Sequence, residues 1–434
     1  TALLQGYAEK EEYEYTLSIW RGMRSSGVYP SRHTFMPLLK VCSMMNYVDE
    51  GRNLHHEIIL EGFESDSFLG DTLVDMYAKC GLLVDAQGVF DKIVMRNVVT
   101  WTALIAGYTE CGFGETALLC LTQMQLDGIP PNNITYIFAL KSCISIEDMS
   151  KGQEIHSSVI KEGFEKDPFI SSALIDMYIR FGSIIQAQGV FDEAQVCDLV
   201  VWTTIMAGYV EHGFGSEALQ CFEHMEDDGI LASNVSYTCA LKACGLTGDI
   251  YRGREIQDEI IHRGLLGKDI ILGAMLVDMY GKCGAMEDAQ LVFDELVTRN
   301  EISWNALISG YAQHGQGEDV LNCFELMQIE GLFPDRITFI CSLKACGNIS
   351  AINKGIEIHS AISQKEGYLV EDQDVMLGNA LSDMYAKCGE LAKARDVLDN
   401  LPTHNVVSWN VLITGYAQQG QVEEAFICFE LNWA

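Results

Sequence analysis

Apolar side chains recur along this chain at the spacing of short amphipathic helices. In the phrase LVDMYAKCG the apolar positions fall at i, i+3, i+4 and i+7, one face of a helix, and are Leu73, Met76, Tyr77 and Cys80. Gly81 follows, where a left-handed backbone commonly ends a helix. A second apolar pattern begins in VDAQGVF, close behind this glycine. The pattern therefore predicts two short helices joined by a turn.

The same phrase returns three times at nearly constant spacing. LIDMYIRFG begins at residue 174, LVDMYGKCG at 276 and LSDMYAKCG at 381, so successive copies start 101, 102 and 105 residues apart. Helices this short are marginally stable alone, so each pair must bury its apolar face against the next pair. The periodicity predicts an all-α fold, a right-handed α-solenoid superhelix of stacked helix-turn-helix repeats.

Two further phrases run in phase with the first, so each period holds three kinds of repeat in one array over residues 1–434. Trp-type repeats, named after WTALIAGY, are predicted at 98–132, 199–233 and 301–335, with partial copies at 1–31 and 406–434. GIH-type repeats, named after GIEIH, are predicted at 32–66, 133–167, 234–269 and 336–374. DMY-type repeats are predicted at 67–97, 168–198, 270–300 and 375–405.

Composition and charge narrow the class of protein. The chain is 48% hydrophobic, enough for a large core, yet no apolar run approaches the roughly 18 residues of a membrane span. Its opening TALLQGYAEK matches the interior of a Trp-type repeat, so we expect a fragment truncated at both ends, with any targeting segment upstream. The net charge is −33, whereas nucleic-acid-binding proteins are usually basic. Acidic runs such as EHMEDDG fall in predicted second helices, where they form a solvated outer face.

The repeat lengths carry a family resemblance. Repeats of 35 residues (Trp-type), mostly 35 or 36 (GIH-type) and 31 (DMY-type) follow one another in that order. This arrangement resembles the PLS subclass of pentatricopeptide repeat (PPR) proteins, with the three types as P, L and S repeats. A tetratricopeptide array would have a uniform 34-residue repeat and other signature residues. The resemblance implies that each repeat reads one RNA base with two or three side chains.

In the resembled family the base-reading residues are the fifth and the last of each repeat. Carried over to the Trp-type and DMY-type repeats, these pairs are Thr1/Ser31, Asp71/Asn97, Thr102/Asn132, Ser172/Asp198, Thr203/Ser233, Ala274/Asn300, Asn305/Asp335 and Asn379/Asn405, with Asn410 opening a truncated pair. The GIH-type repeats instead have Met36, Ile137, Thr238 and Ile340 at the fifth position and Asp66, Asp167, Asp269 and Asp374 at the last. Mostly apolar fifth residues cannot form hydrogen bonds, so these repeats are expected to tolerate any base.

The family's code implies a loose target string. Thr102/Asn132 suggests A, Ser172/Asp198 suggests G, and Asn305/Asp335 suggests U. Asn379/Asn405 suggests C or U, and Ala274/Asn300 leans to A. Read from the fourth repeat to the twelfth, the string is A-n-G-n-n-(A)-U-n-Y.

The second residue of each repeat packs against the base in the resembled family. The matching residues here are Phe68, Val99, Phe169, Val200, Ile271, Ile302, Met376 and Val407. Ordinary core packing is the alternative interpretation of these apolar side chains.

A cation stands just before the glycine that ends each DMY-type first helix. These candidate phosphate contacts are Lys79, Arg180, Lys282 and Lys387. A cation near a helix C-terminus is equally well explained by the helix dipole.

Other residue patterns do not predict chemistry. His55, His156 and His359 occur once per period, too far apart in a solenoid to bind one metal ion. His224 and Glu226 resemble a zinc-deaminase motif, but the required C-x-x-C pair is missing from the whole sequence. The absence of C-x-x-C pairs also favours reduced, packed cysteines over a disulfide framework. We therefore expect no enzyme active site, no cofactor, no metal and no small-molecule substrate in this chain.

The resulting hypothesis is sequence-specific binding of single-stranded organellar RNA. The resemblance implies a specificity factor for RNA modification, C-to-U editing, or for other transcript processing, in a mitochondrion or chloroplast. Proteins of an editing complex are the further partners it suggests, and no membrane is expected. The alternative is a helical-repeat scaffold that binds a protein or peptide, which the acidic charge favours.

Overall fold

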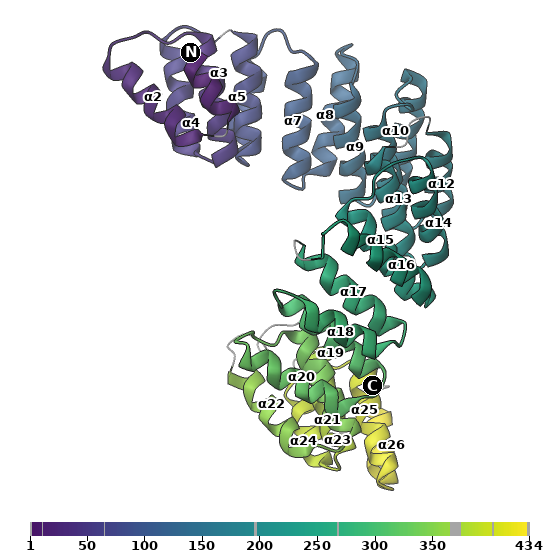
Figure 1. The fold of residues 1–434 in the computed structure, drawn as a ribbon. Helices are drawn as coiled ribbons and strands as arrows, with labels where there is room; N and C mark the ends of the chain where they lie inside the picture. The colour runs from purple at the N-terminus through teal and green to yellow at the C-terminus, as the bar shows by residue number, and fades with distance from the viewer. Residues whose placement is uncertain are drawn as a thin grey trace. The chain divides into compact units, whose positions relative to one another are not determined.

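The computed structural model describes residues 2–10, 12–64, 66–194, 198–266, 269–364, 375–401 and 403–431. Over these ranges it contains 26 helices and no strand, which confirms the predicted all-α class (Figure 1). Odd-numbered helices are the first of each pair. They are α1 (Ala2–Glu9), α3 (Arg32–Met45), α5 (Ser67–Lys79), α7 (Val98–Glu110), α9 (Asn133–Ser145), α11 (Pro168–Arg180), α13 (Leu199–Glu211), α15 (Asn234–Thr247), α17 (Ile270–Lys282), α19 (Glu301–Gln313), α21 (Arg336–Asn348), α23 (Val375–Lys387) and α25 (Val406–Gln418).

Even-numbered helices are the second of each pair. They are α2 (Tyr13–Ser25), α4 (Val48–Leu60), α6 (Leu83–Lys92), α8 (Gly114–Leu126), α10 (Met149–Glu162), α12 (Ile184–Glu193), α14 (Gly215–Asp227), α16 (Ile250–His262), α18 (Met286–Glu295), α20 (Gly317–Ile329), α22 (Ile352–Gln364), α24 (Leu391–Asp399) and α26 (Val422–Leu431). Gly81, between α5 and α6, has a φ of +74°, as the tight turn between the two helices requires. The assignment of these pairs to three repeat types stays a prediction.

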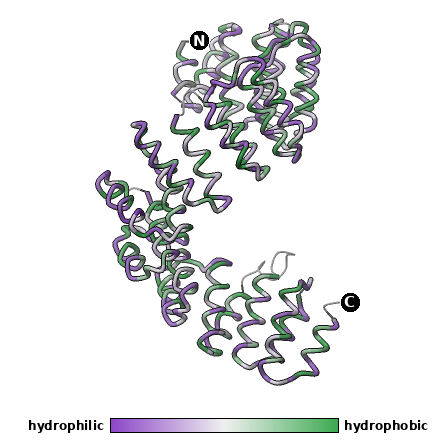
Figure 2. Tube along the Cα trace, turned by 90° about the vertical axis from the view of Figure 1, so that its right-hand side faces the viewer, coloured by the Kyte–Doolittle hydropathy of each residue, from purple (hydrophilic) through white to green (hydrophobic). Residues whose placement is uncertain are grey.

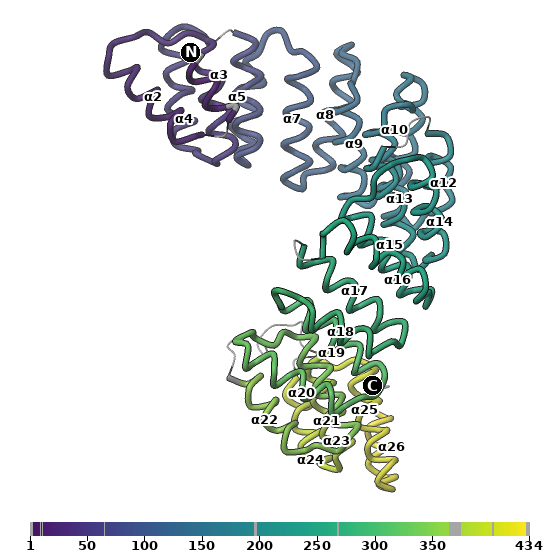
Figure 3. Tube along the Cα trace, in the orientation of Figure 1, coloured from purple at the N-terminus to yellow at the C-terminus, as the bar shows by residue number. Residues whose placement is uncertain are grey.

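The helices stack in chain order within two compact blocks, Thr1–Gly208 and Tyr209–Ala434. In the N-terminal block α3, α5, α7, α9 and α11 pack side by side, and in the C-terminal block α15, α17, α19, α21, α23 and α25 do so. Within each block second helices pack against their own first helices, and most also pack against the next one, as α8 does against α7 and α9. Consecutive pairs can be followed along the colour gradient of each block (Figure 3). This is the stacking expected of an α-solenoid.

The first helices begin where a polar side chain caps them. The last residue of the preceding predicted repeat accepts backbone N–H groups of the new helix at Asp66, Asn97, Asn132, Asp167, Asp198, Ser233, Asp269, Asn300, Asp335 and Asn405. Such a cap satisfies backbone donors that have no partner inside the helix. The ends of the candidate base-reading repeats are therefore also helix starts.

Adjacent repeats interlock through recurring side-chain pairs. Trp101 packs edge-on against Phe90 with ring centroids 4.6 Å apart, and the same contact joins Trp304 to Phe293 at 4.5 Å. Along the helices, hydrophobic and hydrophilic stretches alternate, so each helix has an apolar side to bury (Figure 2). None of the helices described is long and apolar enough to cross a membrane.

Three histidines of the GIH-type repeats form hydrogen bonds with a tyrosine of the following repeat. Nδ1 lies 2.9, 2.8 and 2.9 Å from a tyrosine hydroxyl in the pairs His55–Tyr77, His156–Tyr178 and His359–Tyr385. Gln257 takes the same place in the remaining period and accepts a hydrogen bond from Tyr280. Burial lowers the pKa of all three histidines, so they are neutral hydrogen-bonding groups of the interface.

Candidate nucleic-acid interface

The fifth residue of a first helix faces the cap of the next first helix. The clearest case joins α19 to α21, where Asn305 Nδ2 donates to Asp335 Oδ2 over 2.7 Å. Asp335 Oδ1 accepts the backbone N–H of Thr338 over 2.9 Å, and the Thr338 hydroxyl lies within hydrogen-bonding reach of Asn305 Oδ1. These contacts fix the Asn305 amide and leave one of its N–H groups and one lone pair without a partner in the described part of the chain.

Two further fifth/last pairs meet in the N-terminal block. Asn97 Nδ2 donates to Asp71 Oδ2 over 2.8 Å, and the Thr100 hydroxyl donates to Asp71 Oδ1. Thr102 and Asn132 are joined through Thr135, whose hydroxyl lies 2.7 Å from the Thr102 hydroxyl and donates to Asn132 Oδ1 over 2.8 Å. In both pairs the fifth residue, the last residue and a threonine hydroxyl form one hydrogen-bonded cluster near the N-terminal ends of the first helices.

In the C-terminal block Asn379 Nδ2 lies 3.4 Å from Asn405 Oδ1, a long contact. Asn379 Oδ1 is buried and has no hydrogen-bond partner among the described residues. A buried carbonyl oxygen without a donor is costly, so the Asn379 side chain is incompletely satisfied in the free protein.

Three other predicted pairs show no direct hydrogen bond between their two members, which all lie within the described residues. Ser172 Oγ lies 2.9 Å from Thr204 Oγ1, while Asp198 caps α13. The Thr203 hydroxyl donates to the Leu199 carbonyl of its own helix over 2.8 Å, and Ser233 caps α15. Ala274 is buried and apolar beside its partner repeat, whose last residue Asn300 caps α19. Ser31 donates its backbone N–H to Thr34, Asn410 is exposed, and Thr1 lies outside the described residues.

Helix capping explains why the last residue of a repeat is polar, but it does not explain why the fifth residue is polar. Asn, Asp and Ser at the last position are what a helix start requires, so their polarity alone is no sign of base reading. Polar fifth residues such as Asn305 and Asp71 lie inside a helix, where folding gains little from them. The hydroxyls of Thr100, Thr135 and Thr338, which complete three of these spots, were missed from the sequence. Their spacing of three residues after the cap is the signature of a capping box and could have revealed them.

The GIH-type repeats differ at the same two positions. Their last residues also cap, but Asp167 Oδ2 accepts from Asn133 Nδ2 over 2.8 Å, and Asp269 accepts from Asn234 in the same way. Asp66 lies 3.8 Å from Arg32, and Asp374 lies outside the described residues. Both carboxylate oxygens of Asp167 and Asp269 are therefore used by the protein itself.

The fifth residues of the GIH-type repeats offer no free polar group. Met36, Ile137 and Ile340 are apolar and half-buried. The Thr238 hydroxyl donates to the Asn234 carbonyl of its own helix over 2.9 Å.

The apolar second residues are about half exposed, which favours packing against a bound molecule over ordinary core packing. The side chains predicted to pack against bases are 48–62% exposed: Phe68, Val99, Phe169, Val200, Ile271, Ile302, Met376 and Val407. Three second residues of GIH-type repeats, Ile134, Val235 and Ile337, are also 49–59% exposed and were not predicted. Exposed apolar side chains that recur at one repeat position are available to pack against a bound molecule.

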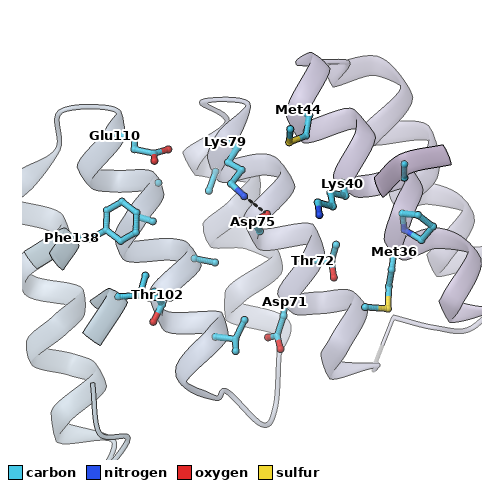
Figure 4. A pocket seen from close by; sticks show the side chains of 18 of the residues that line it. Met36, Lys40, Met44, Asp71, Thr72, Asp75, Lys79, Thr102, Glu110 and Phe138 are labelled. Atoms are coloured by element: carbon cyan, nitrogen blue, oxygen red, sulfur yellow. Dashed lines mark hydrogen bonds and ion pairs between the residues drawn. The ribbon is translucent and has the colours of Figure 1, made fainter. Parts of the chain in front are cut away.

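A groove of about 710 Å³ brings these positions together on the first helices of the N-terminal block. Asp71, Val99, Thr102 and Asn132 line it, and Figure 4 shows Asp71 and Thr102 facing the same side as Met36 and Phe138. The second, fifth, sixth, ninth and thirteenth residues of neighbouring first helices form much of its surface because these positions share one helix face.

The predicted cationic positions are occupied by ion pairs. Lys79 Nζ lies 2.9 Å from Asp75, four residues earlier on the same helix (Figure 4). Equivalent pairs join Arg180 to Asp176, Lys282 to Asp278 and Lys387 to Asp383 at 3.1, 2.7 and 2.8 Å. A phosphate would have to compete with these carboxylates.

The acidity of the chain lies mostly outside the first helices. The first helices carry ten Lys or Arg against nine Asp or Glu, whereas the rest of the chain carries 18 against 52. The first helices themselves are thus close to neutral, and the negative charge lies on the second helices and on the loops, which include the cap aspartates such as Asp335. The described residues form no cluster of His, Cys, Asp and Glu that could hold a metal ion.

Pentatricopeptide repeat models match the chain along most of its length. The model of the PPR repeat family matches residues 96–145, 198–245 and 299–348, and that of the PPR repeat matches 71–98, 275–301 and 407–431. A pentatricopeptide repeat domain model matches residues 1–45.

Curated relatives and a solved structure agree with this match. The chain is 33% identical to the chloroplastic pentatricopeptide repeat-containing protein At4g18520 of Arabidopsis thaliana, over 98% of this chain and 68% of the relative. It is 32% identical to the mitochondrial At2g03380 of the same plant, over 99% of this chain and 61% of the relative. The maize PPR10 crystal structure in complex with an 18-nt psaJ RNA element has a TM-score of 0.70 at 18% identity, covering 98% of this chain and 67% of that one.

The fold is that of a helical-repeat solenoid, and the chain belongs to the pentatricopeptide repeat family. It spans about half to two thirds of the length of the curated relatives it matches.

Proposed function

We propose that this chain binds single-stranded RNA in a sequence-specific manner inside a chloroplast or mitochondrion. The observation that carries the proposal is the set of polar fifth residues at helix-interior positions, above all Asn305 and Asn379. Among the described residues Asn305 has no partner for one N–H and one lone pair. These are the groups that the edge of an unpaired base can engage.

Three further observations support RNA. The exposed apolar second residues supply faces on which bases can pack. The first helices are near neutral, so most of the net charge of −33 lies on the second helices and loops. PPR10, which has the same fold, is solved with an RNA element, and relatives carry chloroplastic or mitochondrial names.

Within this function we propose a finer role. The cycle of three repeat lengths is typical of PLS arrays, which act as specificity factors for C-to-U editing, and other transcript processing would use the same binding. In this account the chain recognises RNA and proteins of an editing complex act on it. The chain itself is a binding array and not the catalyst.

Fluorescence anisotropy with a labelled random-sequence single-stranded RNA tests the binding. We expect saturable binding that is competed by single-stranded RNA and poorly by duplex RNA, whose bases are already paired. A helical-repeat scaffold for a protein is the second candidate because second helices and loops are strongly acidic. No RNA binding at low salt, together with binding of a cationic peptide library, would favour the scaffold.

A further inference from the structure

A second series of cations runs along the first helices, at a position that the family resemblance did not single out. The ninth residue of every GIH-type repeat is lysine: Lys40, Lys141, Lys242 and Lys344. All four side chains are exposed, on α3, α9, α15 and α21. The ninth residue of a Trp-type repeat is small and that of a DMY-type repeat is Asp, so the lysine occurs once per three repeats.

These lysines lack the carboxylate partner that the DMY-type cations have. Residues four before and four after Lys40 are Met36 and Met44, and the corresponding neighbours of the other three lysines are likewise uncharged. No ion pair involves any of the four within the described part of the chain. The contrast with Lys79, which is 2.9 Å from Asp75, follows directly from this sequence difference.

Lys40 lies in the groove and Lys141 lies beside one of its residues. Lys40 lines the groove together with Asp71 and Thr102, and Figure 4 shows its ammonium group on the groove side of α3. Lys141 lies with its Nζ 5.5 Å from the ring centroid of Phe138, another groove residue. The ninth residue is one helical turn beyond the fifth, which places the cation beside the row of base-reading positions rather than within it.

We propose that Lys40, Lys141, Lys242 and Lys344 each bind one phosphate of the RNA backbone. This inference rests on the proposed RNA binding. It assigns to the GIH-type repeats the role of binding the RNA backbone. They do not read a base, but they anchor the strand once every three nucleotides. Lysine suits this because an ammonium group binds phosphate as a point charge without demanding a fixed geometry.

Salt dependence of binding tests the proposal most directly. Four phosphate contacts on a single strand predict a slope of log K against log salt of about −2.8, and each Lys→Gln variant should make it shallower by about 0.7. Each variant should also bind about fivefold to tenfold more weakly at low salt, with an unchanged base preference. The probe is a labelled random-sequence single-stranded RNA, with the whole chain as the protein.

Two controls separate phosphate binding from bulk charge. Lys161→Gln on the second helix α10 makes the same charge change away from the first-helix layer and should leave the slope unaltered. The double variant Lys151→Gln, Glu154→Gln on α10 removes an ion pair of a second helix at constant charge and should also leave it unaltered. Circular dichroism confirms that each variant is folded.

The outcomes are distinguishable. If the wild-type chain does not bind RNA, the proposed function is wrong and this inference is wrong with it. If the wild-type chain binds and Lys40→Gln changes the slope no more than Lys161→Gln does, RNA binding stands and the phosphate contacts are wrong.

Discussion

The Trp-type and GIH-type repeats use the same helix ends in different ways. In the Trp-type repeat, Asp335 caps a helix with one oxygen and receives the fifth residue, Asn305, with the other. In the GIH-type repeat, Asp167 caps a helix with one oxygen and receives Asn133, its own repeat's first residue, with the other. In the GIH-type arrangement the carboxylate is hydrogen-bonded to the first residue of the repeat, so the fifth residue takes no part in the hydrogen-bonded cluster. An aspartate at the last position can therefore belong to a base-reading site or only to a helix cap. Which of the two it is depends on the side chain that donates a hydrogen bond to its second carboxylate oxygen.

Replacing each of the two aspartates should separate helix capping from base reading. We expect these substitutions to have the largest effect on RNA affinity. Asp335→Ala and Asp167→Ala should each lower the free energy of unfolding by about 1 kcal/mol, because each removes a cap. Asp335→Ala should also weaken binding to RNA that carries the preferred base by about 1–3 kcal/mol, the usual cost of one mismatched position. Chemical denaturation and anisotropy give the two quantities. Equal loss of RNA affinity in both variants would contradict the comparison.

Exchanging the fifth residue should change base preference. By the family's code Asn305→Thr should move the preference at its position from U to G, by about tenfold and with other positions unchanged. Ile137→Asn is the matched variant in a GIH-type repeat. It should create no clear preference, because Asn133 already occupies Asp167 Oδ2. Sequencing of the RNA bound by each variant checks both, and a strong new preference in Ile137→Asn would count against the comparison.

The exposed second residues should contribute affinity in both repeat types. Val99→Ala and Ile134→Ala should each cost about 0.5–1 kcal/mol in RNA binding, since a base would cover part of each side chain. Neither should reduce stability, because both side chains are exposed in the free protein. Only Val99→Ala should alter discrimination between bases. Loss of stability without loss of RNA affinity would restore the core-packing interpretation.

A smaller change in the stability of the folded chain is expected when the pH is lowered. His55, His156 and His359 have pKa values lowered by burial, so the unfolded chain binds protons more readily than the folded one. Stability should therefore be constant above the unfolded pKa of about 6.5 and fall as pH drops below it towards the lowered folded values. The triple variant with Gln at these positions copies Gln257 and should lose this part of the pH dependence. Thermal melts between pH 7 and 5 measure it, with a change of about 1–3 °C expected. An identical pH profile in both proteins would contradict the role of the histidines.

The local patterns predicted the fold better than the site. Helical spacing around LVDMYAKCG predicted the pair that the structure shows as α5 and α6, because burial of one face determines such helices. The ion pairing of Lys79 with Asp75 was also readable from their spacing of four residues. The exposure of Phe68 and Phe169 was not, because a pattern of apolar residues does not say which face the neighbouring helices cover. Nor could Asn133 be found as the partner of Asp167, a contact between residues 34 positions apart.

The central claim is that Trp-type and DMY-type repeats discriminate bases and GIH-type repeats do not. Selection of a random single-stranded RNA pool on the wild-type chain, followed by sequencing of the bound fraction, tests it most directly. The account predicts enrichment of A-n-G at the positions of Thr102/Asn132 and Ser172/Asp198, with no base preferred at the intervening GIH-type position. A preference at that intervening position as strong as those beside it would contradict the account.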